Sequence, residues 1–147
     1  NVEIVLPVDV VVSVEFDSQS PYRTCPISEI GEREMLLDIG PQTRDIYAKV
    51  LSDSSTVLWN GPMGVFEWDH YSEGTRLIAR SIAKDGVVSV IGGGSTVDAV
   101  SKFGLEARMT HISTGGGASL EFMEGKDLPG IVSLLDAEDS NQKGVSE

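Results

Sequence analysis

Short apolar runs alternate along most of the chain with stretches of helical periodicity. Each run is short enough and apolar enough to be a buried strand, and the stretches between them place apolar side chains on one helical face. The predicted strands lie near residues 56–59, 87–91 and 109–113. The predicted helices lie near residues 42–52, 72–83, 96–103 and 117–124. This alternation predicts an α/β fold with a parallel sheet that is covered by helices on both faces.

The first forty residues follow another pattern. Residues 4–14 are rich in β-branched side chains and predict a buried strand, in which Pro7 favours an edge or a bulge. Residues 17–31 have little periodicity and predict an irregular loop or a short hairpin at one edge. Residues 35–39 predict a second short strand. Pro41 then suits the first turn of a helix, where a missing N–H costs nothing.

The length of 147 residues suits one domain with a sizeable core. We expect this domain to span residues 1–136. The polar stretch 137–147 has no apolar face to bury and is expected to be a disordered tail. Because the chain lacks an initiating Met and enters a strand almost at once, we expect it to be a fragment of a longer protein.

Three glycine-rich turns follow the three predicted strands, at residues 60–64, 92–95 and 115–117. Right-handed crossovers would bring all three turns to the carboxyl edge of the parallel sheet, where such sheets bind ligands. A turn that opens a helix directs backbone N–H groups and a positive helix end at one point. The turns therefore predict a phosphate site without cationic side chains, although neither triple-glycine run is a GxGxxG or GxxxxGK[ST] motif.

The charge and the cysteine content exclude several classes of partner. The formal net charge of −12 disfavours binding to nucleic acid and to anionic membrane surfaces. Residues 1–12 are too short and too charged to span a membrane. Cys25 is the only cysteine, so no internal disulfide can form, and a reducing, cytoplasmic setting with a buried Cys25 thiol is expected.

Five segments resemble, in order and spacing, signatures of the phosphoglycerate kinase family. They are Leu-Pro-Val-Asp at 6–9, Asp-Ile-Gly-Pro at 38–41, and the segments 59–67, 91–94 and 111–121. The resemblance runs over residues 2–136 and covers the last third of the family's proteins. It implies the C-terminal part of a six-stranded, doubly wound, three-layer nucleotide-binding domain with a mostly parallel sheet. The parent would be a monomeric glycolytic enzyme that transfers phosphoryl reversibly between 1,3-bisphosphoglycerate and ADP, giving 3-phosphoglycerate and ATP, with Mg²⁺.

The resemblance also implies roles for particular residues. Those that would bind the nucleotide are Asn60, Glu67, Gly93, Gly94, Ser95 and Thr96. Glu67 would take the ribose hydroxyls, and Asn60 would lie beside the polyphosphate. The turn formed by Gly115, Gly116 and Gly117 would be catalytic, because its N–H groups would face the phosphoryl group in transfer.

Other interpretations of single residues compete with these. Without the resemblance, Glu67 would be read as an ordinary solvated acid. His111 lies in a predicted buried strand, and a core histidine is favoured there over an acid–base catalyst. Trp59 and Phe66 are expected to pack as bulky anchors of the adjacent turn rather than to stack on a ligand.

The sequence departs from the family pattern in ways that qualify the function. Ser95 occupies the position of an acidic residue that engages the metal, and a neutral hydroxyl is a weaker ligand for Mg²⁺, so we assign no metal-binding residue. Leu36 replaces a glycine of the adenine pocket. The resemblance implies that the 3-phosphoglycerate site belongs to a first domain outside this sequence. The alternative is therefore a non-catalytic relative that binds a nucleotide or anion or only self-associates, and we expect the chain alone to self-associate or to be marginally stable.

Overall fold

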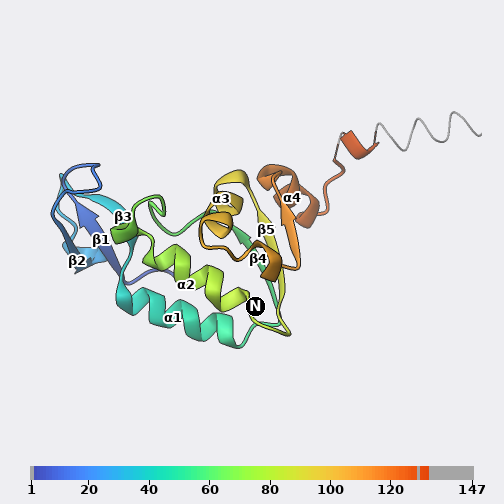
Figure 1. The fold of residues 1–147 in the computed structure, drawn as a ribbon, viewed down its shortest axis with the longest axis horizontal. Helices are drawn as coiled ribbons and strands as arrows, with labels where there is room; N and C mark the ends of the chain where they lie inside the picture. Colours follow the sequence, from blue (N-terminus) through green and yellow to red (C-terminus); the bar gives the residue numbers. More distant parts are fainter. Residues whose placement is uncertain (1, 129, 133–147) are drawn as a thin grey trace, which may run out of the picture.

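The computed structural model describes residues 2–128 and 130–132. The tail predicted at 137–147 lies outside these residues, and the domain boundary at 136 stays a prediction. The described chain forms two three-stranded sheets, which lie at opposite ends of the molecule with two long helices between them (Figure 1). The predicted α/β class is confirmed, but the strands are divided between an antiparallel and a parallel sheet.

The antiparallel sheet is built from the first forty residues and has the order β2-β1-β3. Its strands are β1 (Asp9–Ser13), β2 (Tyr22–Pro26) and β3 (Met35–Ile39). Of the two alternatives predicted for residues 17–31, the structure supports the edge hairpin, because β2 pairs antiparallel with β1 at one edge of the sheet. The strand expected over 4–14 is shorter than predicted. Residues 9–13 have partners on both sides, whereas no described strand pairs with residues 2–8, and Pro7 has no N–H to donate.

The parallel sheet contains the three strands that were predicted from their apolar runs. They are β4 (Thr56–Asn60), β5 (Val88–Gly92) and β6 (His111–Ser113), in the order β4-β5-β6. Both pairs are parallel, with Leu58 opposite Val90 and Val90 opposite His111. The register places the last residue of β4 opposite the last residue of β5, so the turns that follow begin at the same level of the sheet.

All four predicted helices are present. They are α1 (Pro41–Ser52), α2 (Glu73–Ile82), α3 (Gly94–Lys102) and α4 (Gly116–Met123), and α1 begins at Pro41 as expected. Short 3-10 turns occur at Ile27–Glu29, Asp69–Tyr71 and Glu106–Arg108. The main core lies between α2, α3 and one face of the parallel sheet, and it contains Trp59, Ile78, Ala79, Ile82, Ile91 and Val100. Tyr47 and Leu51 of α1 pack against its margin.

The opposite face of the parallel sheet is covered only in part. Since side chains alternate along a strand, Leu58, Val90 and His111 face away from the main core. With α4, Leu128 and Ile131 they line a depression of about 420 Å³. His111 is exposed there, so the expectation of a core histidine is wrong, because the edge strand β6 presents His111 to this uncovered face.

Candidate functional site

The three glycine turns meet at the carboxyl edge of the parallel sheet, as predicted. β4 ends at Asn60, β5 at Gly92 and β6 at Ser113, and these residues lie opposite one another in the strand register. The helices α3 and α4 begin at Gly94 and Gly116, within three residues of those strand ends. The N-termini of two helices are therefore directed to the same edge of the sheet.

The turns touch one another so closely that glycine is required. The amide of Gly93 donates a hydrogen bond to the carbonyl of Ser113 (3.1 Å). Gly93 has φ of +90°, and a Cβ there would lie 2.8 Å from Oδ1 of Asn60. A Cβ on Gly116 would lie 2.8 Å from Cα of Gly93. The resemblance assigned Asn60 and Gly93 to nucleotide binding and Gly116 to catalysis, and the structure brings the three residues into one contact cluster.

The first turns of α3 and α4 supply backbone donors at this cluster. N–H groups at the start of a helix have no intrahelical acceptor, and neither helix has a side chain that caps its N-terminus. The residues before them, Gly93 and Gly115, have no side chain at all. Such donors, together with the positive ends of two helix dipoles, can hold an anionic oxygen without a cationic partner.

Thr96 has a position that the sequence did not reveal. Its side chain is 1% exposed, and Oγ1 accepts a hydrogen bond of 2.7 Å from the amide of Gly61. The indole of Trp59 donates to the carbonyl of the same glycine at 2.7 Å. Thr96 therefore holds the turn after β4 against α3, and its predicted contact with nucleotide phosphates stays a prediction.

The structure separates the remaining predicted residues into buried anchors and exposed positions. Trp59 and Phe66 are each 5% exposed, which confirms that they pack inside the protein. Glu67 and Ser95 are exposed, and neither side chain hydrogen-bonds to another residue in the described ranges. The predicted contacts of Glu67 with ribose and of Ser95 with the nucleotide phosphates stay predictions.

Two residues that fix the segment after β4 carry no signal in the sequence pattern. Oγ1 of Thr75 accepts hydrogen bonds from the amides of Met63 (3.0 Å) and Gly64 (3.3 Å). Lys102 donates to the carbonyls of Phe66 (2.9 Å) and Glu67 (2.8 Å). Both lie on helices more than ten residues away in sequence, so only the folded chain relates them to the turn.

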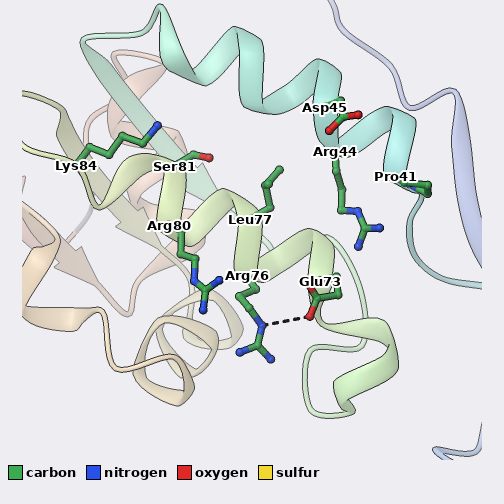
Figure 2. A pocket seen from close by; sticks show the side chains of 9 residues that line it. All are labelled: Pro41, Arg44, Asp45, Glu73, Arg76, Leu77, Arg80, Ser81 and Lys84. Carbon is green, nitrogen blue, oxygen red and sulfur yellow. Dashed lines mark ion pairs between the residues drawn. The ribbon is translucent and has the colours of Figure 1, made fainter.

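A second depression, of about 440 Å³, lies on the outer side of α1 and α2. Figure 2 shows Arg44 extending from α1 toward α2, with Arg76 and Arg80 on α2 itself. Asp45 and Glu73 line the same depression, and Glu73 pairs with Arg76 at 3.5 Å. Because its charges are mixed and its lining residues include none from the glycine turns, we do not assign it to the site.

The described residues were searched for metal-binding clusters and for helices that could span a membrane. Among them, no three His, Cys, Asp or Glu side chains are grouped closely enough to hold a metal ion. No helix within the described ranges has the length and apolar character needed to cross a membrane.

Comparisons with known proteins identify the family of the chain. A family model described as phosphoglycerate kinase matches residues 1–126. The phosphoglycerate kinase of Rubrobacter xylanophilus is 52% identical over 136 residues, which cover 92% of this chain and 35% of the relative. That of Chlorobaculum tepidum is 50% identical over 139 residues, with the same coverage. The chain thus spans about a third of the length of these curated relatives.

Solved structures lead to the same family. The phosphoglycerate kinase of Coxiella burnetii has a TM-score of 0.77 at 44% identity, covering 82% of this chain and 32% of that one. The enzyme of Pyrococcus horikoshii has a TM-score of 0.75 at 33% identity, covering 90% of this chain and 33% of that one. With the family model matching most of its residues, the chain belongs to the phosphoglycerate kinase family.

Proposed function

We propose that this chain is the nucleotide-binding portion of a phosphoglycerate kinase and that it binds ADP and ATP at the carboxyl edge of the parallel sheet. The observation that carries the proposal is the meeting of the α3 and α4 N-termini at Asn60, Gly93 and Gly116. The amides of Gly94 and Ser95, for which the described residues offer no acceptor, would hold the nucleotide phosphates, with Gly93 and Thr96 lining the same turn. Glu67 would take the ribose hydroxyls.

The turn of Gly115, Gly116 and Gly117 would stabilise the phosphoryl group in transfer. Phosphoryl transfer demands mainly positioning and charge stabilisation, and fixed backbone amides supply both without reorganising. This turn is supported against the nucleotide turn by the hydrogen bond from Gly93 to Ser113 and by the contact of Gly116 with Gly93. Its donors are therefore held in place before a ligand arrives.

The parent would transfer phosphoryl reversibly between 1,3-bisphosphoglycerate and ADP as a cytoplasmic, glycolytic enzyme. The 3-phosphoglycerate site would come from a domain outside this chain. In-line alignment of two substrates contributes about 7–11 kcal/mol to such reactions. The chain alone is therefore expected to bind nucleotide without turning it over.

In this proposal, Mg²⁺ would be bound by the nucleotide phosphates and not by side chains of this chain. The donor set at the site does not fit a tightly held divalent cation, because Ser95 offers a neutral hydroxyl and the described residues hold no group of three acidic, His or Cys side chains. We therefore assign no metal ligand in this chain and derive no step through the metal.

A second candidate is a chain that only self-associates, and the free edge of the parallel sheet favours it. In the described part of the chain, β4 pairs only with β5, which leaves backbone donors and acceptors of β4 unpaired on its other side. Such an edge is a template for another strand. The parent, with its further segments, is expected to be a monomer.

Calorimetry with ADP, together with a coupled kinase assay, tests the nucleotide proposal. Gly93→Ala is expected to abolish ADP binding, because Gly93 has φ of +90° and its new Cβ would meet Asn60. Gly125→Ala is the matched control, since Gly125 also has a positive φ of +75° but has open space around it. Absence of ADP binding by the folded chain, or equal loss of binding in both variants, contradicts the proposal. Turnover by the chain alone would contradict the proposal that the acceptor site lies outside this chain.

A further inference from the structure

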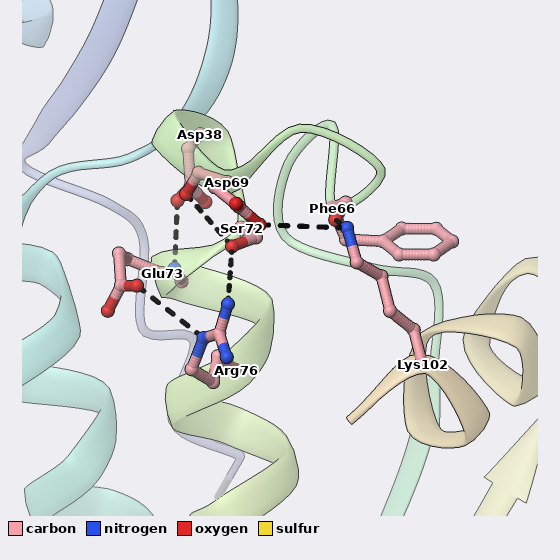
Figure 3. A network of polar contacts seen from close by, with 8 residues as sticks. Asp38, Phe66, Asp69, Ser72, Glu73, Arg76 and Lys102 are labelled. Carbon is pink, nitrogen blue, oxygen red and sulfur yellow. Dashed lines mark hydrogen bonds and ion pairs between the residues drawn. The ribbon is translucent and has the colours of Figure 1, made fainter. Parts of the chain in front are cut away.

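The side chain of Lys102, the last residue of α3, ends between two backbone carbonyls. Its Nζ donates to the carbonyl of Phe66 at 2.9 Å and to that of Glu67 at 2.8 Å. Oδ1 of Asp69 lies 3.9 Å from the same nitrogen. Figure 3 shows the ammonium reaching from α3 to the segment that precedes α2. Lys102 thus binds the backbone of the residue that is expected to contact ribose.

The same helix holds both ends of the segment 61–67. At its first turn, Oγ1 of Thr96 accepts the amide of Gly61 at 2.7 Å, and at its last residue Lys102 binds the carbonyl of Glu67. The two anchors are six positions apart on the helix, which corresponds to a rise of about 9 Å. The position of Glu67 is therefore tied to the helix whose N-terminus begins at Gly94.

An ammonium group suits this junction for two reasons. It has three donors and no acceptor, so it can satisfy two carbonyls and still face Asp69. It also lies at the C-terminus of α3, where a cation is favoured by the helix dipole. The side chain is 35% exposed, whereas Asp69 is 87% exposed, so the two carbonyls rather than the carboxylate are the stable partners.

We propose that Lys102 is a positioning residue that sets the place of Glu67 relative to the phosphate-binding turn, and that it thereby gives the site its preference for nucleotides with ribose hydroxyls. The inference rests on the proposed nucleotide function. Lys102 touches only the protein backbone and acts on the ligand through Glu67. Removing it would leave the phosphate amides of α3 in place and release the ribose contact.

The test is calorimetry with three probes: ADP, 2′,3′-dideoxy-ADP and inorganic pyrophosphate. A hydrogen bond to a charged group corresponds to roughly a tenfold preference or more, so the parent chain is expected to bind ADP at least ~10-fold more tightly than dideoxy-ADP. In Lys102→Met this preference is expected to fall to about twofold or less, because Glu67 would no longer be held where it can bind the ribose hydroxyls. Pyrophosphate affinity should stay the same, and Lys102→Arg, which keeps a cation with several donors, should restore most of the preference.

Glu67→Gln is the second variant needed for the test. If Lys102 acts through Glu67, then Lys102→Met adds no further loss of preference in the Glu67→Gln background, as a double-mutant cycle would show. A Lys102→Met chain that keeps the full ADP preference overturns the inference alone. A parent chain that binds pyrophosphate but does not distinguish ADP from dideoxy-ADP overturns the ribose contact and the inference together. Circular dichroism selects folded variants, and Lys102→Gln replaces Lys102→Met if the latter unfolds.

Discussion

The carboxylate of Asp38 accepts a hydrogen bond of 2.8 Å from the amide of Gly74 and so joins β3 to the first turn of α2 (Figure 3). It also accepts the amide of Ile39 at 2.8 Å. Asp38 is 3% exposed, and Cβ atoms on Gly64 and Gly74 would lie 2.6 and 2.3 Å from its Oδ1. The segment after β4 and the start of α2 thus pack around one buried acid.

This acid makes stability depend on pH in an unusual direction. Burial raises the pKa of Asp38 from 3.8 to about 6, against the lowering effect of the Gly74 and Ile39 amides. Between these two values the folded chain binds more protons than the unfolded chain, so the contribution of Asp38 falls as the pH rises from 4 to 6. Asp38→Asn should remove that fall, which amounts to at most about 3 kcal/mol.

Urea unfolding of the parent chain and Asp38→Asn at pH 4.5 and 7.5 measures this difference. Asp9 and Glu34 have lowered pKa values and favour stability at higher pH, so only the comparison between the two chains isolates Asp38. Parallel stability curves for the two chains would contradict the prediction.

The second prediction concerns the anchor of α1. Oγ1 of Thr43 accepts the amides of Val8 (2.9 Å) and Asp9 (3.1 Å), and the Asp9 carboxylate accepts the amide of Thr43 at 2.7 Å. Burial alone would raise the pKa of Asp9, but bonds from Thr43 and Gln42 keep it below its ordinary value. Thr43→Val leaves buried amides without an acceptor and is expected to cost about 2–4 kcal/mol. Thr43→Ser should cost less than about 1 kcal/mol, because it keeps the hydroxyl. Equal melting temperatures for the two variants in thermal denaturation would refute the role of the hydroxyl.

The third prediction separates two neighbouring glycines. Gly116→Ala places a Cβ 2.8 Å from Cα of Gly93, whereas Gly117→Ala meets nothing within 4 Å. Overpacking of rigid backbone costs about 1–3 kcal/mol, so Gly116→Ala should lower the melting temperature. Gly117→Ala should leave it unchanged or raise it, because Ala is favoured over Gly in a helix by about 1 kcal/mol. A stable Gly116→Ala chain would show that the two turns are not in contact.

The fourth prediction follows from the hydroxyl at position 95. Ser95→Asp is expected to strengthen binding of Mg-ADP more than binding of metal-free ADP, because a carboxylate is a hard anionic ligand. Ser95→Asn is the control, because asparagine is similar in size to aspartate but carries no charge, and it should show no such gain in Mg-ADP binding. Calorimetry with and without magnesium measures both, and equal Mg-ADP affinities for the three chains would remove Ser95 from the metal's surroundings.

The fifth prediction is self-association of the chain through β4. Thr56 is exposed at the start of this edge strand, and lysine on an edge strand opposes pairing with a second chain. Thr56→Lys is expected to shift the mass measured by light scattering toward the monomer. A parent chain that is monomeric and unfolds cooperatively at high concentration would refute the prediction.

The sequence by itself determined the elements and the ligand edge. The apolar runs at β4, β5 and β6 and the glycines after them require only local information: side-chain period, backbone freedom at Gly93 and the rule for right-handed crossovers. Pro41 likewise marked the start of α1 without reference to any distant residue.

Only the tertiary structure decided which elements meet. The strand over residues 9–13 lies between β2 and β3 in an antiparallel sheet, and the apolar pattern of one strand does not contain the identity or direction of its two partners. His111 became exposed because α4, Leu128 and Ile131 leave its sheet face partly open. Thr96 and Lys102 hold the segment 61–67 through hydrogen bonds across about 35 residues, and such contacts arise from the packing of α3 rather than from any periodicity.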